Sequence, residues 1–189
     1  MKIVVATNNQ GKLREIKEIL RGGFELVSLR DINLEIEVDE TEETFLGNAL
    51  LKARGVYEAC GLPCLADDSG LCVEALGGNP GVQSAYFAGI PTNNEKNNAL
   101  LLEKMKGETN RKAKFVSTVV LYFGEGKYIV GEGETTGKIL DKLTGENGFG
   151  YDPLFFSDEL NRSFGEACPN EKNKISHRGR ALKDLMKKL

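Results

Sequence analysis

The chain has 189 residues, a formal net charge of −3, 40% hydrophobic residues and 28% charged residues. This length suits one domain, or a compact domain of two lobes, with a substantial core. The slightly acidic balance argues against a large nucleic-acid-binding surface, and no apolar run approaches the ~20 residues that span a membrane. The first apolar stretch is too short for a signal peptide. The four cysteines lack the spacing of a zinc site, so we expect free thiols in a reducing cytoplasm.

The N-terminal third predicts the order strand, helix, strand, helix. Apolar residues recur at helical spacing from Leu13 to Leu20, and Gly22-Gly23 ends that first helix. After an acidic, irregular stretch at residues 31–43, Thr44 opens a longer helix that ends near Gly61. The two expected strands are residues 2–6 and 25–29.

The middle of the chain predicts strands, turns and a further helix. Apolar runs at residues 62–66 and 71–76 flank a turn at Ser69-Gly70, and a glycine-rich loop follows. Thr92 and Glu95 fit a capping box for a helix that runs through Met105.

The last third predicts a hairpin and a C-terminal helix. The hairpin turns at residues 124–127, between strands at residues 114–123 and 128–134. Ser176 caps a final helix whose apolar residues follow helical spacing as far as Leu189. The element order predicts an α/β fold with a mixed central sheet flanked by helices, formed by residues 1–189 as a single domain.

Asp67 and Asp68 are the most informative pair in the chain. They follow an apolar run and precede Ser69-Gly70. Ionised carboxylates are costly to bury without a partner, and a hard divalent cation such as Mg²⁺ is a natural partner because it takes oxygen ligands. Asp-Asp-Ser-Gly is also ordinary turn chemistry, so the pair alone leaves both interpretations open.

Residues 6–13 join the first strand to the first helix and favour phosphate binding. A loop that opens onto a helix N-terminus presents backbone N–H groups and the positive end of the helix dipole, and Lys12 adds a charge there. The Walker pattern fails, because Ala6 stands where glycine is needed and Leu13 where Ser or Thr is needed. Any Mg²⁺ must therefore be held elsewhere. An Asn-rich capping turn is the alternative interpretation.

Carboxylates before the second long helix, and a lysine within it, form another candidate group. Acidic residues at positions 39–43 favour the helix N-terminus through its dipole, and Glu40, which lies before the helix proper, is the candidate metal ligand among them. Lys52 lies inside the helix among apolar residues. It either extends along its own stem to solvent or points to phosphates.

Two segments of the C-terminal half suggest recognition of a base. Glycines flank Phe149 and permit close backbone approach, and an exposed ring offers a stacking surface; anchoring in the core is the alternative. Ser176-His177-Arg178 starts the last helix, where side chains and backbone donors converge on an anion or a carbonyl. For His177 the alternative is a histidine that is simply exposed.

Five motifs together resemble one family. They are Thr7-Asn8 with Lys12, residues 66–71 (Ala-Asp-Asp-Ser-Gly-Leu), residues 76–81, residues 148–153 (Gly-Phe-Gly-Tyr-Asp-Pro) and Ser176-His177-Arg178. In this order they are similar to the motifs of the inosine/xanthosine triphosphate pyrophosphatases, which clear noncanonical purine nucleotides. One departure is Tyr86, which stands where that family usually has Arg.

The resemblance implies a mixed α/β fold of two lobes around a long central sheet, with a nucleotide cleft between the lobes, and a homodimer. It also implies Mg²⁺-dependent hydrolysis of dITP, ITP and XTP to the monophosphate and pyrophosphate in the cytoplasm, with no nucleic-acid or membrane partner. Asp68 matches the proton acceptor, and Glu40 and Asp68 match the metal ligands. The positions that match substrate contacts are Thr7, Asn8, Asn9, Gln10, Gly11, Lys12, Lys52, Ser69, Phe149, Gly150, Tyr151, Asp152, Lys172, His177 and Arg178.

The chemistry of such a substrate agrees with these roles. Lys12, Lys52 and Lys172 would compensate the charge of a triphosphate. Inosine and xanthosine carry a carbonyl acceptor at C6 where adenosine carries an amine donor, so donors near His177 and Arg178 favour them. Two alternatives stay open: a related pyrophosphatase specific for modified pyrimidines or for dTTP and UTP, and a nucleotide-binding regulator without catalysis.

Overall fold

Seven strands form one mixed sheet in this computed structural model, which describes residues 1–189. The strand order is β2-β1-β3-β4-β5-β6-β7. β1 pairs in parallel with β2 and β3, whereas β6 pairs antiparallel with β5 and β7, which confirms the predicted mixed sheet. The strands are β1 Lys2–Val5, β2 Glu25–Ser28, β3 Cys64–Val73, β4 Lys112–Gly124, β5 Lys127–Ile139, β6 Phe155–Ser157 and β7 Arg162–Ser163.

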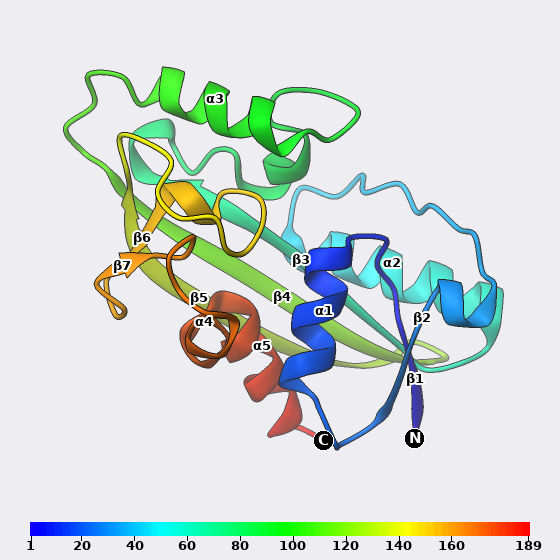
Figure 1. The fold of residues 1–189 in the computed structure, drawn as a ribbon. Coiled ribbons are helices and arrows are strands. Elements are labelled where there is room, and N and C mark those ends of the chain that lie inside the picture. Colours follow the sequence, from blue (N-terminus) through cyan, green and yellow to red (C-terminus); the bar gives the residue numbers. More distant parts are fainter. The chain divides into compact units, whose positions relative to one another are not determined.

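Helices of two kinds accompany the sheet (Figure 1). The α-helices are α1 Gln10–Ile19, α2 Phe45–Cys60, α3 Asn94–Lys104, α4 Pro169–Ile175 and α5 His177–Met186. The short 3₁₀ helices are η1 Arg30–Ile32, η2 Glu74–Leu76, η3 Gly81–Tyr86 and η4 Asp152–Leu154. None of these helices combines the length and the apolar character that a membrane span needs.

The chain divides into two compact units. Unit 1 comprises residues 1–68, 117–133 and 178–189, and unit 2 comprises residues 69–116 and 134–177. The strands β3, β4 and β5 each contribute residues to both units. The nucleotide cleft implied by the family resemblance stays a prediction.

Unit 1 buries both faces of its part of the sheet. Ile3 and Val5 of β1 pack in one apolar cluster with residues of α1 and α5, among them Ile16 and Leu182. Val4, which lies between them in the sequence, packs in a second cluster with apolar residues of α2. Because successive side chains of a strand point to opposite faces, α1 and α5 cover one face and α2 covers the other (Figure 1).

The predicted ends of the first two helices follow local capping rules. The side chain of Asn9 accepts a hydrogen bond from the backbone N–H of Lys12, so α1 begins at Gln10, before its first apolar residue. Thr44 caps α2 in the same way, and Gly61 ends it with a φ of 67°, a left-handed conformation that glycine adopts at little cost. The predicted cap and end of α2 are confirmed.

The acidic segment, residues 33–43, contains neither helix nor strand and packs against α2. Leu34 and Ile36 join the cluster that α2 forms with the sheet. A Cβ at Gly55 of α2 would lie 2.9 Å from Val38, so glycine makes room for the segment. Alternate residues therefore face α2, and the segment brings Glu40 to the side of Lys52.

Unit 2 is built around an aromatic cluster. Leu101 and Met105 of α3 pack with Phe115, Phe155 and Phe164. The centroids of these three rings lie 4.7 to 6.0 Å apart, within the range in which aromatic pairs attract one another. This cluster supports the loop that carries the glycine-aromatic motif, since Tyr151 and Leu154 belong to it.

The turn predicted at Ser69-Gly70 is wrong. β3 runs from Cys64 to Val73 without interruption, with Asp67 and Asp68 in its middle. A Cβ at Gly70 would collide with the carbonyl oxygen of Gly81. Glycine is therefore required here for a close approach of two backbone segments, and the sequence alone did not distinguish this from a turn.

The capping box predicted at Thr92 is also wrong. Asn93 caps α3, because its side chain accepts a hydrogen bond from the N–H of Lys96. The hydroxyl of Thr92 instead donates to the carbonyl oxygen of Ala85. Asn is as good a cap as Thr, so the helix starts one residue later than the Thr-Glu pattern indicates.

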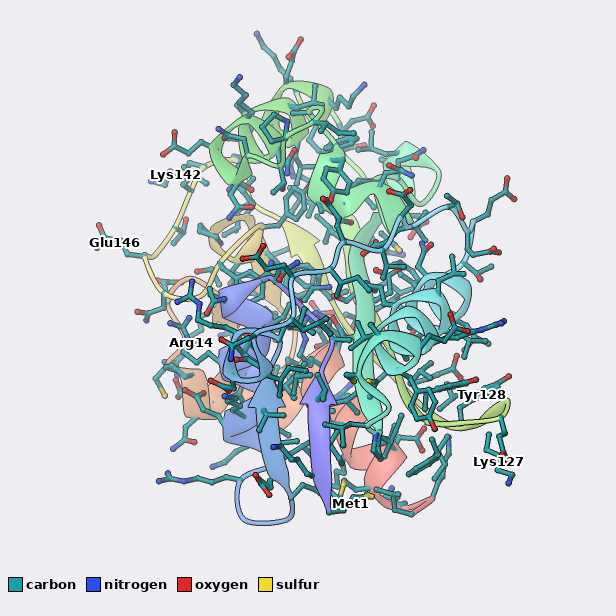
Figure 2. All side chains as sticks on the ribbon, turned by 90° about the vertical axis from the view of Figure 1, so that its right-hand side faces the viewer. Met1, Arg14, Lys127, Tyr128, Lys142 and Glu146 are labelled. Carbon is teal, nitrogen blue, oxygen red and sulfur yellow. The ribbon has the colours of Figure 1, made fainter.

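The hairpin and the start of the last helix agree with the predictions, as does the state of the cysteines, whereas α5 ends at Met186, before the predicted Leu189. β4 and β5 are neighbours joined at Glu125-Gly126, and the side chains of Lys127 and Tyr128 project outward from this turn (Figure 2). α5 begins at His177, directly after Ser176. All four cysteines are free thiols. β7 and α4 were not predicted.

Candidate active site

Asp67 is a buried carboxylate whose two oxygens both have partners. Oδ1 accepts a hydrogen bond from the hydroxyl of Ser117, and Oδ2 lies 2.9 Å from Nζ of Lys12 and 3.2 Å from Nη2 of Arg178. Burial raises the pKa of Asp67, but the charges of Arg178 and Lys12 outweigh burial, so the pKa lies well below its usual value. Asp67 is therefore an ionised anchor for two basic groups.

Arg178 is the other half of this buried ion cluster. Its side chain is among the largest that are fully buried, and its guanidinium donates to Glu15 Oε2 on α1 as well as to Asp67. Burial lowers the pKa of Arg178, but Asp67 and Glu15 outweigh it, so the pKa is raised further and the group stays charged. Two carboxylates thus already engage its guanidinium. The role of Arg178 in base recognition stays a prediction.

Two members of the cluster were missed in the sequence. Glu15 lies three residues after Lys12, a spacing that places both on one face of α1, and it precedes the buried Ile16. A glutamate on the buried side of a predicted helix could have indicated a buried ion pair. Ser117 lies within the apolar run of β4, and nothing in its surroundings distinguished it from a core serine.

Asp68 differs from its neighbour because one of its oxygens is unpaired. Oδ1 lies 3.3 Å from Nζ of Lys52, whereas Oδ2 is buried without a hydrogen-bond partner. Burial raises the pKa of Asp68, and Lys52 and Lys12 offset this only in part. A buried carboxylate oxygen without a partner needs a proton or a cation. Asp68 is thus the carboxylate of this cluster that is placed to take part in chemistry.

Lys52 connects Asp68 to Glu40. Its Nζ lies 2.8 Å from Oε1 of Glu40 and donates to the carbonyl oxygen of Asp67 at 2.9 Å. Burial lowers the pKa of Lys52, but Asp68 and Glu40 outweigh burial, so the pKa is raised and the ammonium stays charged. Lys52 therefore does not extend to solvent. It stands between the two carboxylates predicted as metal ligands.

These two carboxylates fit a magnesium ion that is completed by its substrate. No group of three or more His, Cys, Asp or Glu side chains is placed to hold a metal ion. Mg²⁺ commonly takes one or two carboxylates and fills its remaining positions with water and phosphate oxygens. The unpaired Oδ2 of Asp68 and the nearby carboxylate of Glu40 offer such a partial site.

The charge balance of the ion cluster in unit 1 also favours a bound divalent cation. The ion cluster has one more carboxylate than basic groups, so it would repel a bare polyanion. A divalent cation reverses that balance. Its carboxylates are Glu15, Glu40, Asp67 and Asp68, and its basic groups are Lys12, Lys52 and Arg178.

The loop before α1 is a capping turn that also leaves donors free. Thr7 Oγ1 accepts from the N–H of Asn9, and Asn9 Oδ1 accepts from the N–H of Lys12, so the capping interpretation is confirmed. The N–H groups of Gln10 and Gly11, in the first turn of α1, have no hydrogen-bond partner. Together with the helix dipole they suit a phosphate.

Two residues of this loop have side chains on the outside. Asn8 donates through Nδ2 to the carbonyl oxygen of Ile36 at 3.5 Å, which ties the loop to the acidic segment. Gln10 is exposed and lines a surface hollow of about 430 Å³ on the outer side of α1, where the side chain of Arg14 also lies (Figure 2). The side chain of Gln10 is therefore separate from the ion cluster.

Asp152 and Lys172 form a buried ion pair in unit 2. Lys172 Nζ lies 2.6 Å from Asp152 Oδ2, which also accepts the N–H of Phe149 at 2.9 Å. The same ammonium lies 4.9 Å from the centroid of the Phe149 ring, a cation–π distance. A Cβ at Gly148, where φ is +76°, would collide with Asp152 Oδ2. One carboxylate thus orders both the aromatic ring and the lysine.

Phe149 and His177 occupy different environments in this unit. Phe149 is half-buried, so it is neither a core anchor nor a fully exposed ring. His177 is 4% exposed, and its ring stacks on Phe115 with centroids 4.7 Å apart. The alternative of a simply exposed histidine is wrong, because the aromatic cluster covers it.

The comparisons with known proteins identify the family. The family model of the Ham1 family matches residues 3–188. The chain belongs to the Ham1 family. The dITP/XTP pyrophosphatase of Deinococcus deserti is 52% identical over 185 residues, which cover 97% of this chain and 87% of that protein. The dITP/XTP pyrophosphatase of Thermus thermophilus is 50% identical over 190 residues, which cover 98% and 90%.

Solved structures of Ham1 proteins confirm the fold. The structure of a HAM1 protein from Coxiella burnetii aligns with this chain with a TM-score of 0.89 and 36% sequence identity. The alignment covers 99% of this chain and 97% of that protein. The predicted family and the predicted α/β class are therefore both confirmed.

In this Ham1 chain the predicted site residues fall into two groups. Unit 1 holds the loop before α1 and the charged residues, namely Thr7, Asn8, Asn9, Gln10, Gly11, Lys12, Glu40, Lys52, Asp68 and Arg178. Unit 2 holds the half-buried Ser69 at its start, the residues predicted for the base, namely Phe149, Gly150, Tyr151, Asp152 and His177, and the predicted phosphate contact Lys172. Tyr86 is 39% exposed at the end of η3.

Proposed function

We propose that this Ham1 protein hydrolyses the noncanonical purine nucleoside triphosphates dITP, ITP and XTP to the monophosphate and pyrophosphate, and so removes them from the nucleotide pool. The observation that carries the proposal is the contrast between Asp67, which is fully paired, and Asp68, whose buried Oδ2 is unpaired beside Lys52 and Glu40. Two relatives that share half of its residues are dITP/XTP pyrophosphatases. A cytoplasmic homodimer is part of the same proposal.

The phosphates bind the basic groups and free amides of unit 1. Lys12 and Lys52 are charged and mostly buried, so their attraction for phosphate oxygens is stronger than at an exposed surface. The N–H groups of Gln10 and Gly11 add donors at the start of α1. These groups hold the β- and γ-phosphates as the leaving pyrophosphate.

Glu40 and Asp68 are the residues that would hold Mg²⁺. The ion, when bound, neutralises phosphate charge and supports loss of the pyrophosphate. The unpaired oxygen of Asp68 and the excess of carboxylates in the cluster are the observations that support it.

Asp68 is the general base. The Asp68 carboxylate takes a proton from water as the water oxygen bonds to the α-phosphorus, and the bond between the α-phosphorus and the bridging oxygen breaks. Burial raises the pKa of Asp68, which strengthens its carboxylate as a base. Asp67 keeps Lys12 and Arg178 in place during the step.

Recognition of the base is assigned to unit 2. The ring of Phe149 provides a stacking surface, and His177 supplies a donor for the carbonyl that distinguishes inosine and xanthosine from adenosine. A mispaired polar group costs roughly 1–3 kcal/mol, so we expect ATP to be at least ~10-fold poorer than ITP.

The test is release of pyrophosphate from ITP, dITP, XTP, ATP, GTP, CTP and UTP under identical conditions. We expect the highest kcat/KM for the first three nucleotides. Comparable kcat/KM for ATP and ITP would refute the base selectivity. A preference for UTP or dTTP would favour a pyrimidine-specific enzyme, and no turnover of any nucleotide would favour a binding protein.

Chelation of divalent cations is expected to abolish turnover, and added Mg²⁺ is expected to restore it. Glu40→Gln should raise the Mg²⁺ concentration that gives half-maximal rate, because it removes one of two carboxylate ligands. Asp39→Asn is the matched control, since Asp39 is an exposed acid on the same segment. An equal shift in both variants, or full activity with chelator, would show that Glu40 is not a ligand.

A further inference from the structure

Asn98 of α3 holds the glycine-aromatic loop of unit 2, although none of the motifs includes it. The side chain is 7% exposed. Its Nδ2 donates to the carbonyl oxygen of Gly150 at 3.0 Å, across 52 positions of sequence. Its Oδ1 is buried and has no hydrogen-bond partner. A buried polar atom without a partner is unfavourable for folding, so stability alone is a poor reason for this asparagine.

The hydrogen bond fixes the orientation of one peptide group. The C=O and N–H of a trans peptide point in opposite directions, so a Gly150 carbonyl that faces α3 turns the N–H of Tyr151 away from α3. Gly150 has a φ of 60°. Because glycine lacks a Cβ, its own sterics do little to hold the backbone in one conformation. The contact with Asn98 supplies the restraint that the residue itself does not.

The loop is tied at two neighbouring points by different side chains. The N–H of Phe149 is held by Asp152, and the carbonyl of Gly150 is held by Asn98. Beyond them, the hydroxyl of Tyr151 donates to the carbonyl oxygen of Ser84 at 2.7 Å. We propose that Asn98 is a positioning residue, which holds residues 149–151 in the conformation that receives the base. This inference rests on the proposed function.

The adjacent Asn97 shows what a structural asparagine looks like on the same helix. Its Oδ1 accepts from the N–H of Ala88 at 2.8 Å, and its Nδ2 donates to the carbonyl oxygen of Ala85 at 3.0 Å. Both ends of that amide are satisfied, and neither touches the loop of Phe149. Asn98 has the opposite pattern, with one bond to the loop and one oxygen unpaired.

The experiment compares Asn98→Leu, Asn98→Asp and the control Asn94→Ala, an exposed position in the first turn of α3. Leucine keeps the size of the side chain and removes the donor, so KM for ITP should rise about 3- to 10-fold, the loss expected for one hydrogen bond. Aspartate points a carboxylate at the Gly150 carbonyl, and its increase in KM should be larger. In both variants kcat should change less than about 2-fold, as for lost ground-state binding.

A second probe distinguishes an effect on the loop that receives the base from an effect on the residues that bind the phosphates. Inorganic tripolyphosphate has no base, so its inhibition constant should be the same in the Asn98 variants, in Asn94→Ala and in the wild type. If Asn98→Leu does not fold, Asn98→Ala removes the same donor without adding a branched side chain. An unchanged KM with a lower unfolding midpoint would overturn the proposal, as would equally weakened binding of tripolyphosphate.

The outcomes distinguish this inference from the proposed function. Turnover by the wild type tests the function, and the ratio of variant to wild-type KM tests Asn98. If another nucleotide in the panel proves to be the substrate, the same ratio is measured with that nucleotide. A wild-type protein that hydrolyses none of them overturns both proposals.

Discussion

Asp68→Asn is expected to lower kcat for ITP by ~10²–10⁴-fold, the range for loss of a general base, while the protein stays folded. Asparagine keeps the shape of the side chain, but it cannot take up the proton that the Asp68 carboxylate is proposed to accept. Because burial raises the pKa of Asp68, the folded state already disfavours the charge, and a neutral replacement should leave the free energy of unfolding unchanged or slightly higher. Steady-state kinetics and urea unfolding measure the two effects.

Binding of tripolyphosphate is the control for this variant. Lys12, which pairs with Asp67, is untouched by the substitution, so this phosphate-binding group of the site is retained. A kcat for Asp68→Asn within a few-fold of the wild-type value would remove Asp68 from the role of base, whatever the stability of the variant.

Asp67→Asn, unlike Asp68→Asn, is expected to destabilise the fold. The free energy of unfolding should fall by roughly 3–5 kcal/mol, the usual cost of removing one partner from a buried ion pair. The substitution leaves Arg178 and Lys12 facing a neutral amide in a buried site. Urea unfolding at neutral pH measures the loss. Glu125→Gln is the control, because Glu125 forms an exposed ion pair with Lys127 that contributes about 0–1 kcal/mol.

The dependence on pH gives a second check on Asp67. Its pKa is lowered in the folded state, so its stabilising contribution is complete above the unfolded value of about 3.8 and is lost as the pH falls through the lowered value. The difference between wild type and Asp67→Asn should therefore shrink in acid. Asp68, whose pKa is raised, has the opposite dependence within the wild type. A difference that stays constant far below pH 3.8 would contradict the assignment.

Local chemistry was enough to predict those parts of the fold that local interactions decide. The cap Thr44 and the end at Gly61 each depend on residues within one helical turn. Gly70 was misinterpreted for the opposite reason. Glycine is needed there because the carbonyl of Gly81 lies where a Cβ would be. That segment approaches β3 only in the folded chain, so the Ser-Gly pair in the sequence does not indicate the contact.

The same division applies to the candidate site. Lys12, Lys52 and Asp68 were found because their spacing from a strand or helix end was informative. Contacts between residues distant in sequence were not found. Ser117 reaches Asp67 across 50 positions, and Asn98 reaches Gly150 across 52. Arg178 was selected by its motif, yet its partnership with Asp67, across 111 positions, appears only when the strand and the last helix pack together.

Hydrolysis of ITP in ¹⁸O-labelled water identifies the phosphorus that the water attacks. Water activated by Asp68 is proposed to attack the α-phosphorus, with the β- and γ-phosphates held by Lys12, Lys52 and the amides of α1. We expect label in inosine monophosphate and none in pyrophosphate. Label in pyrophosphate would place the attack on the β-phosphorus, and release of orthophosphate with inosine diphosphate would place it on the γ-phosphorus; either result would contradict the account.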